Sequence, residues 1–334
     1  MTPRIHGGPD AWGVPRFDFS TNSNACGPCP IASDAVRGAD ACHYPDASYC
    51  ALRQQLAAFH AVDAKRVLLA GSASEFIFRI TACVAQRGMN ASGLDQAGKA
   101  SGPVTVCLPP HCYGDYAHAA QAWGLGVTKQ PDAAQLVWAC EPSSPLGGAH
   151  ADWPTWPIKG SLVLDRAYEP LRLSGSPGLN DAQLAQVWQL WTPNKALGLT
   201  GVRAAYAIAP LGADDMVAAV ERLCPSWPVG AHGVAMLQSW VLPEVQAWLA
   251  ESLLTLKVWK VRQLDLLHNL GWHCLPSEAN FFCARPPSGF DLATLRSAGI
   301  KLRDAASFGL PGHVRVGVLP PQAQDALMQA LQVH

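Results

Sequence analysis

The stretch of sequence that decides the fold is Trp191-Thr192-Pro193-Asn194-Lys195-Ala196-Leu197-Gly198-Leu199-Thr200-Gly201-Val202-Arg203. Lys195 stands among small and apolar residues, where an ammonium is poorly hydrated and can lose its proton to act as a Schiff-base nucleophile. Thr192 precedes this lysine and Arg203 follows it, and both side chains are donors of the kind that hold a phosphate dianion. The stretch therefore predicts a site for a phosphorylated aldehyde, with Lys195 as the group that reacts with it.

Length and composition indicate a globular protein with one large and one smaller domain. The chain has 334 residues, of which 49% are hydrophobic, enough to bury a sizeable core. A net charge of -1 and a charged fraction of 15% leave no basic stripe for nucleic acid and no polybasic patch for a membrane. The N-terminal residues form no apolar segment, and no apolar run is long enough to span a bilayer. We therefore expect a cytoplasmic protein that binds neither nucleic acid nor membranes.

Cysteine usage points away from disulfides and metals. The 11 cysteines are an odd number at irregular spacings, which is typical of free thiols in a reducing compartment. No Cys/His spacing suggests a metal site. The tetrapeptide Cys26-Gly27-Pro28-Cys29 has the spacing of a thioredoxin motif but lacks the preceding tryptophan and the strand-to-helix setting. We interpret it as a coincidence.

The lysine stretch resembles the lysine segment of fold-type I pyridoxal-phosphate (PLP) enzymes, roughly S/T-x-S/A-K-x-x-G-L-x-G-x-R. The resemblance implies PLP as the cofactor, bound through Lys195, Thr192 and Arg203. It also implies an α/β fold with a mainly parallel sheet in a large domain and a small α/β C-terminal domain. We expect the N-terminal arm, residues 1–34, to join the small domain, residues 241–334, and residues 35–240 to form the large domain.

Local patterns predict the elements of this fold. Short apolar runs with turn residues at their ends predict strands, and longer periodic runs predict helices. The expected strands are 66–70, 104–108, 136–139, 161–165, 272–275, 280–284, 300–303 and 314–318. The expected helices are 52–59, 76–87, 213–224, about 241–267, 291–298 and 321–331. Residues 88–102, rich in Gly, Ala, Ser and Asn, predict a mobile surface loop.

Further motifs supply the expected cofactor site. The turn Gly71-Ser72-Ala73-Ser74-Glu75 joins a strand to a helix, and the N–H groups at such a helix start face an anion. We assign Ser72, Ala73 and Ser74 to the PLP phosphate. The resemblance implies that Tyr113, which follows a Pro turn, stacks on the pyridine ring, whereas we expect Tyr116 to serve in packing.

The resemblance also assigns the groups around the ring. Asp165 ends a strand in Asp165-Arg166-Ala167-Tyr168, where related enzymes place an acid that pairs with the pyridinium nitrogen. Tyr168 would hydrogen-bond the cofactor's phenolic oxygen. Ser144 stands where the family usually has an asparagine that donates to that oxygen. We expect Arg166, in place of a family glutamate, to be peripheral.

Two N-terminal segments indicate which group of fold-type I enzymes the chain resembles most. The segments His6-Gly7-Gly8 and Asp18-Phe19-Ser20-Thr21-Asn22-Ser23-Asn24 are similar to the opening of threonine-phosphate decarboxylases of cobalamin biosynthesis. Histidinol-phosphate aminotransferases share the Asn-containing turn but usually not His-Gly-Gly. In these families a tyrosine at the place of Tyr44 reaches the partner subunit's cofactor phosphate, which implies a homodimer with shared active sites. The resemblance assigns substrate contacts to six residues: His6, Gly7, Gly8, Asn24, Arg303 and Arg315.

Three functions remain open on the sequence. The first is decarboxylation of L-threonine O-3-phosphate to (R)-1-amino-2-propanol O-2-phosphate, favoured by His6-Gly7-Gly8 and by Trp227. The second is a histidinol-phosphate type of aminotransferase, which has the same lysine, aspartate and arginine set. The third is a non-catalytic protein that binds its ligand in a PLP fold, suggested by Ser144. Each implies a small phosphorylated amino-acid ligand or a close relative of one.

Overall fold

The computed structural model describes residues 6–91, 103–287 and 291–332. Its large sheet has seven strands in the order β2-β8-β7-β6-β5-β3-β4. Their bounds are Val67–Ala70 for β2, Thr105–Cys107 for β3, Gly126–Thr128 for β4, Leu136–Cys140 for β5, Ser161–Asp165 for β6, Trp188–Trp191 for β7 and Ala205–Ile208 for β8. Most of these short strands are buried, as expected for a sheet covered on both faces.

The strand directions decide where functional loops gather. Strands β4, β3, β5, β6 and β7 are mutually parallel, and β8 runs antiparallel to both β7 and β2. Strand β2 therefore runs in the same direction as β7. The carboxyl ends of β2, β5, β6 and β7 consequently lie at one edge of the sheet, the usual place for a ligand in an open α/β sheet.

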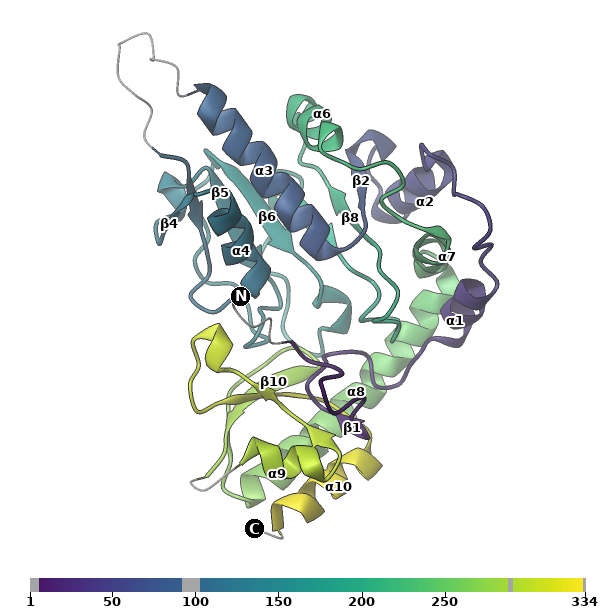
Figure 1. Cartoon of the computed structure of the whole chain (residues 1–334), viewed down its shortest axis with the longest axis vertical. Coiled ribbons are helices and arrows are strands. Elements are labelled where there is room, and N and C mark those ends of the chain that lie inside the picture. Colours follow the sequence, from purple (N-terminus) through teal and green to yellow (C-terminus); the bar gives the residue numbers. More distant parts are fainter. Residues whose placement is uncertain (1–5, 92–102, 288–290, 333–334) are drawn as a thin grey trace.

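Helices cover the two faces of the large sheet (Figure 1). Helices α3 (Ala73–Ala91), α4 (Gly114–Ala122) and α6 (Asp214–Arg222) pack on one face, where Phe76, Ile80 and Tyr116 are fully buried. Helices α2 (Cys50–His60) and α7 (Ala231–Trp240) cover the other face, and α1 (Pro30–Arg37) packs against α7. The short helix α5 is Asp181–Leu184. Single 3₁₀ turns are formed by Ala64–Arg66, Pro131–Ala133, Glu169–Leu171 and Ala306–Phe308.

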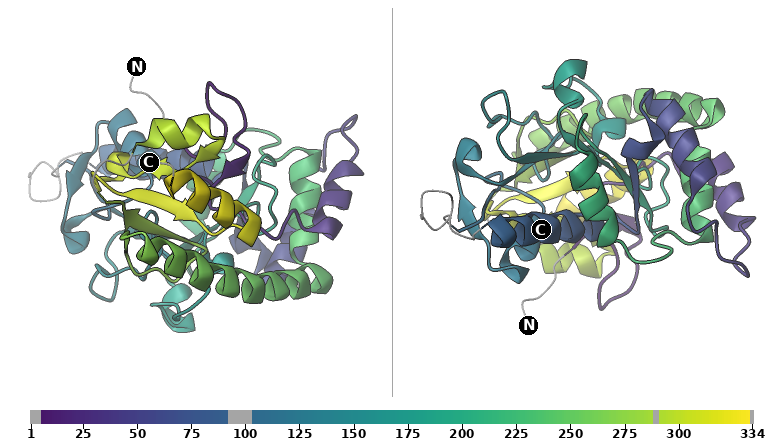
Figure 2. Two further views of the ribbon diagram at one scale, coloured as in Figure 1. Left: turned by 90° about the horizontal axis from the view of Figure 1, so that it is seen from below. Right: turned by 90° about the horizontal axis from the view of Figure 1, so that it is seen from above.

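A second, antiparallel sheet lies below the large one in Figure 1. Its strand order is β12-β13-β10-β9, and the bounds are Arg303–Asp304, Val314–Gly317, Phe281–Arg285 and His273–Cys274. Helices α9 (Leu292–Ser297) and α10 (Pro321–Gln332) accompany it. The two short strands β1 (Phe17–Asp18) and β11 (Ile300–Lys301) form a parallel pair, so the N-terminal arm is attached to C-terminal residues. Figure 2 shows the long helix α8 (Pro243–Asn269) extending from these elements toward α1.

Most predicted elements are confirmed to within a few residues, and the mainly parallel sheet is confirmed. The prediction of one strand over 300–303 is wrong, because β11 pairs with β1 whereas β12 pairs with β13 in another sheet. The predicted loop at 88–102 is wrong for residues 88–91, which continue α3, and residues 92–102 lie outside the described part. Gly88 stands where a Cβ would lie 2.1 Å from Val104 Cγ2, so this glycine allows a close approach of the helix.

Residues 1–5 of the predicted arm also lie outside the described part. Across the described ranges, no helix combines the length and the apolar character that crossing a membrane requires. The sulfur atoms of all 11 cysteines are free in the structure.

Candidate active site

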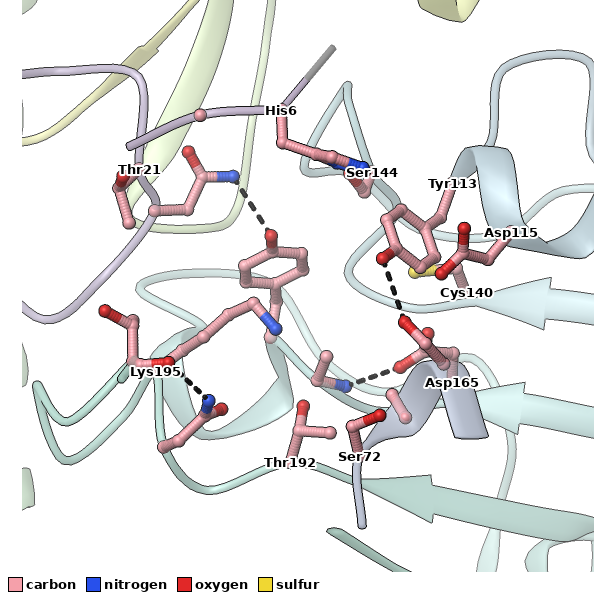
Figure 3. Close-up of a pocket in the computed structure, with 18 of the residues that line it drawn as sticks. His6, Thr21, Ser72, Tyr113, Asp115, Cys140, Ser144, Asp165, Thr192 and Lys195 are labelled. Atoms are coloured by element: carbon pink, nitrogen blue, oxygen red, sulfur yellow. Dashed lines mark hydrogen bonds between the residues drawn. The ribbon is translucent and has the colours of Figure 1, made fainter. Parts of the chain in front are cut away.

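A cavity of about 550 Å³ opens at the carboxyl edge of the large sheet. The predicted site residues that line it come from both ends of the chain: His6, Gly7, Ser72, Ala73, Ser74, Tyr113, Ser144, Asp165, Tyr168, Thr192, Lys195, Arg203 and Arg315. Figure 3 shows Lys195, Asp165, Thr192, Ser72 and Tyr113 around this cavity. Folding thus brings together side chains that are as many as 309 positions apart in the sequence, from His6 to Arg315.

Hydrogen bonds to backbone carbonyls fix the loop that carries Lys195. Asn24 donates from its backbone N–H to the Lys195 carbonyl over 2.8 Å and from its side chain to the Ala196 carbonyl over 3.0 Å. The backbone N–H of Cys29 donates to the Leu197 carbonyl over 2.8 Å. Three consecutive carbonyls of the lysine loop are therefore fixed by the segment around the Cys26–Cys29 tetrapeptide. The Lys195 ammonium lies 5.3 Å from the centre of the Tyr168 ring, a cation–π distance.

Asp165 is a buried carboxylate at the end of β6. Tyr116 donates to its Oδ2 over 2.6 Å, and the Ala167 N–H donates to its Oδ1 over 3.0 Å. Burial raises the pKa of Asp165, while the Tyr116 hydroxyl and the Lys195 charge act in the opposite direction. A cationic ligand group beside Asp165 would stabilise its charged form. Tyr116 stacks on Trp138 at 4.4 Å, so it serves in packing as predicted and also holds Asp165, a role that the sequence did not indicate.

A second group of lining residues offers hydrogen-bond donors that could hold a phosphate. Ser72 and Ala73 stand where α3 begins, and Ser74 Oγ lies 3.1 Å from the hydroxyl of Tyr113. Thr192 Oγ1 is buried and has no hydrogen-bond partner among the described residues. An unpartnered buried hydroxyl is costly, and a ligand oxygen would satisfy it. Arg203 lines the same cavity with an exposed side chain.

These residues fit PLP. Asp165 would face the pyridinium nitrogen, Lys195 would hold the aldehyde carbon, and Thr192, Arg203 and the start of α3 would hold the phosphate. When bound, PLP supplies an electron sink for the bond that breaks at the substrate's α-carbon. Burial raises the pKa of Tyr113 to about 12, which keeps its ring neutral and suitable for stacking.

Some predicted residues lie elsewhere. Gly8, Asn24, Arg303 and Tyr44 do not contribute to the lining of this cavity in the described structure. Asn24 holds the lysine loop, and the Gly8 carbonyl accepts a hydrogen bond of 2.5 Å from Lys301. Arg303 is 4% exposed and donates to the Asp304 carbonyl and the Ser307 hydroxyl. Tyr44 is 78% exposed and stacks on Trp227 at 4.5 Å.

Arg303 and Arg315 are nevertheless neighbours. They are directly opposite each other in the β12–β13 ladder, and their guanidinium carbons lie 4.9 Å and 5.3 Å from the centre of the Phe308 ring. Burial and the Arg315 charge lower the pKa of Arg303. Two adjacent buried cations favour an anion nearby, and Arg315 is the one that lines the cavity.

Arg166 lies outside the cavity lining, as expected, although it is buried. Its guanidinium donates to Gln189 Oε1 over 2.9 Å and lies 4.4 Å from the centre of the Trp191 ring. It supports β7, the strand that leads into the lysine loop, without lining the cavity. Sequence reasoning also missed Asn22, whose amide donates to the Tyr168 hydroxyl over 3.3 Å. The available signal was its place between Ser20 and Asn24, in the polar N-terminal motif that the sequence already assigned to the site.

The family model for aminotransferase class I and II matches residues 105–331. Histidinol-phosphate aminotransferase 2 of Pseudomonas aeruginosa is 26% identical over 340 residues, covering 94% of this chain and 87% of the relative. Histidinol-phosphate aminotransferase from Sinorhizobium meliloti, solved in complex with pyridoxal-5'-phosphate, superposes with a TM-score of 0.72 at 20% identity, over 93% of this chain and 90% of that one. L-threonine-O-3-phosphate decarboxylase from Porphyromonas gingivalis gives a TM-score of 0.68 at 19% identity, over 90% and 91%.

The fold and site thus define a fold-type I PLP-dependent enzyme, as the sequence predicted. The chain belongs to the class I and II aminotransferase family, whose members depend on PLP. A purely non-catalytic role is therefore not supported.

We expect Arg203→Ala to weaken retention of PLP far more than it alters folding. A charge-assisted bond to phosphate is lost, and because Arg203 is exposed we expect a roughly tenfold weaker affinity. Dialysis followed by measurement of the bound cofactor's visible absorbance tests this. The control is Arg87→Ala, which removes an exposed arginine near the far end of α3. Retention equal to wild type would refute the assignment of Arg203.

Proposed function

We propose that this enzyme decarboxylates L-threonine O-3-phosphate to (R)-1-amino-2-propanol O-2-phosphate, a reaction of cobalamin biosynthesis, in the cytoplasm. The observation that carries this proposal is the position of the N-terminal His6-Gly7 segment, which lines the cavity together with Lys195 and Arg315. Gly7 lies so close to the chain that a Cβ would be 2.2 Å from the Ser20 carbonyl oxygen. The backbone at Gly7 therefore packs directly against Ser20, and a larger residue would not fit at this position.

The charges of the cavity support a doubly acidic substrate. Lys195, Arg203 and Arg315 are the lysine and arginine side chains that line it, against the carboxylates of Asp115 and Asp165. With the cofactor phosphate on Thr192 and Arg203, Arg315 is left for an acidic group of the substrate. Arg315 Nε is buried and has no partner in the described structure, and a phosphate oxygen would satisfy it.

The bond that breaks depends on how the substrate is oriented. A carboxylate that is bound more strongly in the ground state than in the transition state would leave slowly, so a decarboxylase should not grip it tightly. We infer that Arg315 binds the phosphate, supported by Arg303, while the backbone around Gly7 places the carboxylate. Lys195 is positioned to accept or deliver a proton at the α-carbon.

The second candidate is transamination of histidinol phosphate or a similar substrate. It is favoured by the relatives, because histidinol-phosphate aminotransferases recur among them at 25–27% identity. Incubation of the holoenzyme with threonine phosphate and, separately, with histidinol phosphate discriminates the two. Release of CO2 from threonine phosphate supports decarboxylation. Conversion of the cofactor to pyridoxamine phosphate, without CO2, would overturn it in favour of transamination.

We also propose a homodimer with shared sites. Tyr44 is exposed and stacked on Trp227, whose indole N–H donates to the Pro45 carbonyl over 3.0 Å, so the tyrosine is presented outward and held there. Such a side chain is suited to reach the cofactor phosphate of a second copy. We further infer that the arm up to residue 34 and residues 241–334 form one domain and residues 35–240 the other. The pairing of β1 with β11 supports this division.

Mixing two inactive variants tests the role of Tyr44. We expect a Tyr44→Phe subunit with intact Lys195 to regain activity when mixed with a Lys195→Ala subunit. One of the two sites in the mixed dimer then has both groups, so up to about half of the sites of that dimer can work. If exchange of subunits is verified and no mixture is active, Tyr44 does not serve the partner's site.

A further inference from the structure

One short segment, Ser20 to Asn24, contacts three separate parts of the active site. The Ser20 carbonyl accepts a hydrogen bond of 3.1 Å from Arg315 Nη2. Two residues on, the Asn22 amide donates to the Tyr168 hydroxyl, and two further on, Asn24 holds the lysine loop. These contacts let one short segment set the relative positions of all three groups.

Asn22 has features beyond those of a packing residue. It is 3% exposed and lines the cavity. Its backbone carbonyl accepts a hydrogen bond of 3.3 Å from Asn280, which fixes the residue from behind. Its Nδ2 donates to Tyr168 over 3.3 Å, whereas its Oδ1 is buried without a partner in the described part of the chain. A buried amide is costly when only one of its two polar atoms has a partner, and a ligand in the cavity could supply the second.

The neighbouring Ser144 does not supply an amide to the cavity. Its hydroxyl oxygen accepts a bond of 3.3 Å from Arg315 Nη1, so the serine faces the arginine. Tyr168 presents a second hydroxyl close to Lys195, whose ammonium lies 5.3 Å from the tyrosine ring.

We propose that Asn22 is a positioning residue that aims the Tyr168 hydroxyl proton into the cavity, toward the phenolic oxygen of the bound cofactor. A tyrosine oxygen that accepts from an amide keeps its own O–H free to donate. Hydrogen bonds in such a chain also polarise and strengthen one another. Asn22 thereby orients, through Tyr168, a hydroxyl donor on the same cavity that the short side chain of Ser144 lines. The inference rests on the proposed role of Tyr168 and is independent of which substrate is used.

The test is the pH titration of the holoenzyme's visible absorbance, without substrate. Tyr168→Phe removes the donor to the phenolic oxygen, and we expect it to shift the titration midpoint by about half to one pH unit, the size of one hydrogen bond. Asn22→Leu keeps the branching at Cγ but removes the amide, and we expect a shift in the same direction. The double variant should shift little further than Tyr168→Phe, because both changes act on one hydroxyl.

Asn22→Asp sharpens the test, because its carboxylate keeps the shape but can only accept from Tyr168 and would draw the proton away from the cavity. We expect it to shift the midpoint at least as far as Asn22→Leu. The control is Thr21→Ala, which breaks a bond of 2.6 Å to Asp18 in the same segment and should leave the midpoint unchanged. If Asn22→Leu loses the cofactor, Asn22→Ser takes its place.

Four results would overturn the proposal. One is a wild-type titration in Asn22→Leu or Asn22→Asp. The second is strictly additive shifts in the double variant, and the third is a shift in Thr21→Ala as large as that in Asn22→Leu. The fourth is an unshifted Tyr168→Phe, which would also remove the proposed role of Tyr168. None of these outcomes bears on decarboxylation against transamination, which the substrate incubations decide.

Discussion

Lys195→Ala is expected to lower kcat by at least about a thousandfold on any substrate, because the variant lacks both the covalent anchor and the proton carrier at the α-carbon. It should also lose the visible absorbance band of the bound cofactor. Folding should be little affected, since the Lys195 backbone carbonyl, which remains, makes the bond to Asn24. Steady-state kinetics, an absorbance scan and a thermal melt of the purified variant measure the three effects.

The matched control is Lys257→Ala, an exposed lysine on α8 outside the cavity. It should keep both the band and the activity. A Lys195→Ala protein that retained the visible band and turned over substrate at a wild-type rate would show that another amine holds the cofactor. Lys260, which donates to the Ser277 and Ala279 carbonyls and whose pKa burial lowers to about 8, would then be examined next.

Arg315→Ala should produce the second large effect. Its guanidinium is 7% exposed, and removing a buried partner of an anionic group costs about 2 to 5 kcal/mol, or roughly thirtyfold to a few thousandfold in kcat/KM. We expect this loss on threonine phosphate and no gain on threonine. Comparison of kcat/KM for the two substrates in wild type and variant measures the discrimination.

Two further variants serve as controls for the effect of Arg315→Ala on the discrimination between the two substrates. Arg285→Ala removes an exposed arginine from the neighbouring strand β10 and should leave the discrimination intact. Arg303→Ala should lower it less than Arg315→Ala does, because Arg303 stands behind the cavity wall and supports its neighbour. If both Arg303→Ala and Arg315→Ala discriminate between threonine phosphate and threonine as the wild type does, these arginines do not bind the substrate phosphate. That result would favour an aminotransferase in which Arg315 binds the α-carboxylate.

Most of the side chains that the sequence assigned to the cofactor meet in one cavity, because those groups lie where local patterns are clear. The strand 161–165 ends in its aspartate as predicted, and Ser72 to Ser74 do begin a helix. Strands β4, β7 and β8 were not predicted, although β7 leads directly into the lysine loop. β7 and β8 are four residues long and buried throughout, so they show no alternation and resemble any other core segment. β4 has only three residues, none of them buried, which is too short for a pattern.

The substrate side was less predictable. The sequence predicted that Arg303 and Arg315 both lie in strands, but only the antiparallel pairing of β12 with β13 shows that they are neighbours. Only the structure shows that Arg315 lines the cavity whereas Arg303 does not. Asn24 was assigned to the substrate because it lies in a motif. In the fold, the Asn24 side chain instead donates to the Ala196 carbonyl in the loop that carries Lys195. The two residues are 172 positions apart, so no local sequence pattern could predict this contact.

The sequence by itself determined the family and the cofactor, and it predicted which residues would hold the aldehyde and the phosphate, because a thirteen-residue stretch carries a lysine with candidate phosphate donors at fixed spacing. Only the tertiary structure decided that Tyr116 holds Asp165, that Ser144 faces Arg315 and that Asn22 lies against Tyr168. The physical reason is that hydrogen bonds to buried groups form between chain segments brought together by the hydrophobic core. Their partners are therefore set by packing and burial, which spacing along the chain does not encode.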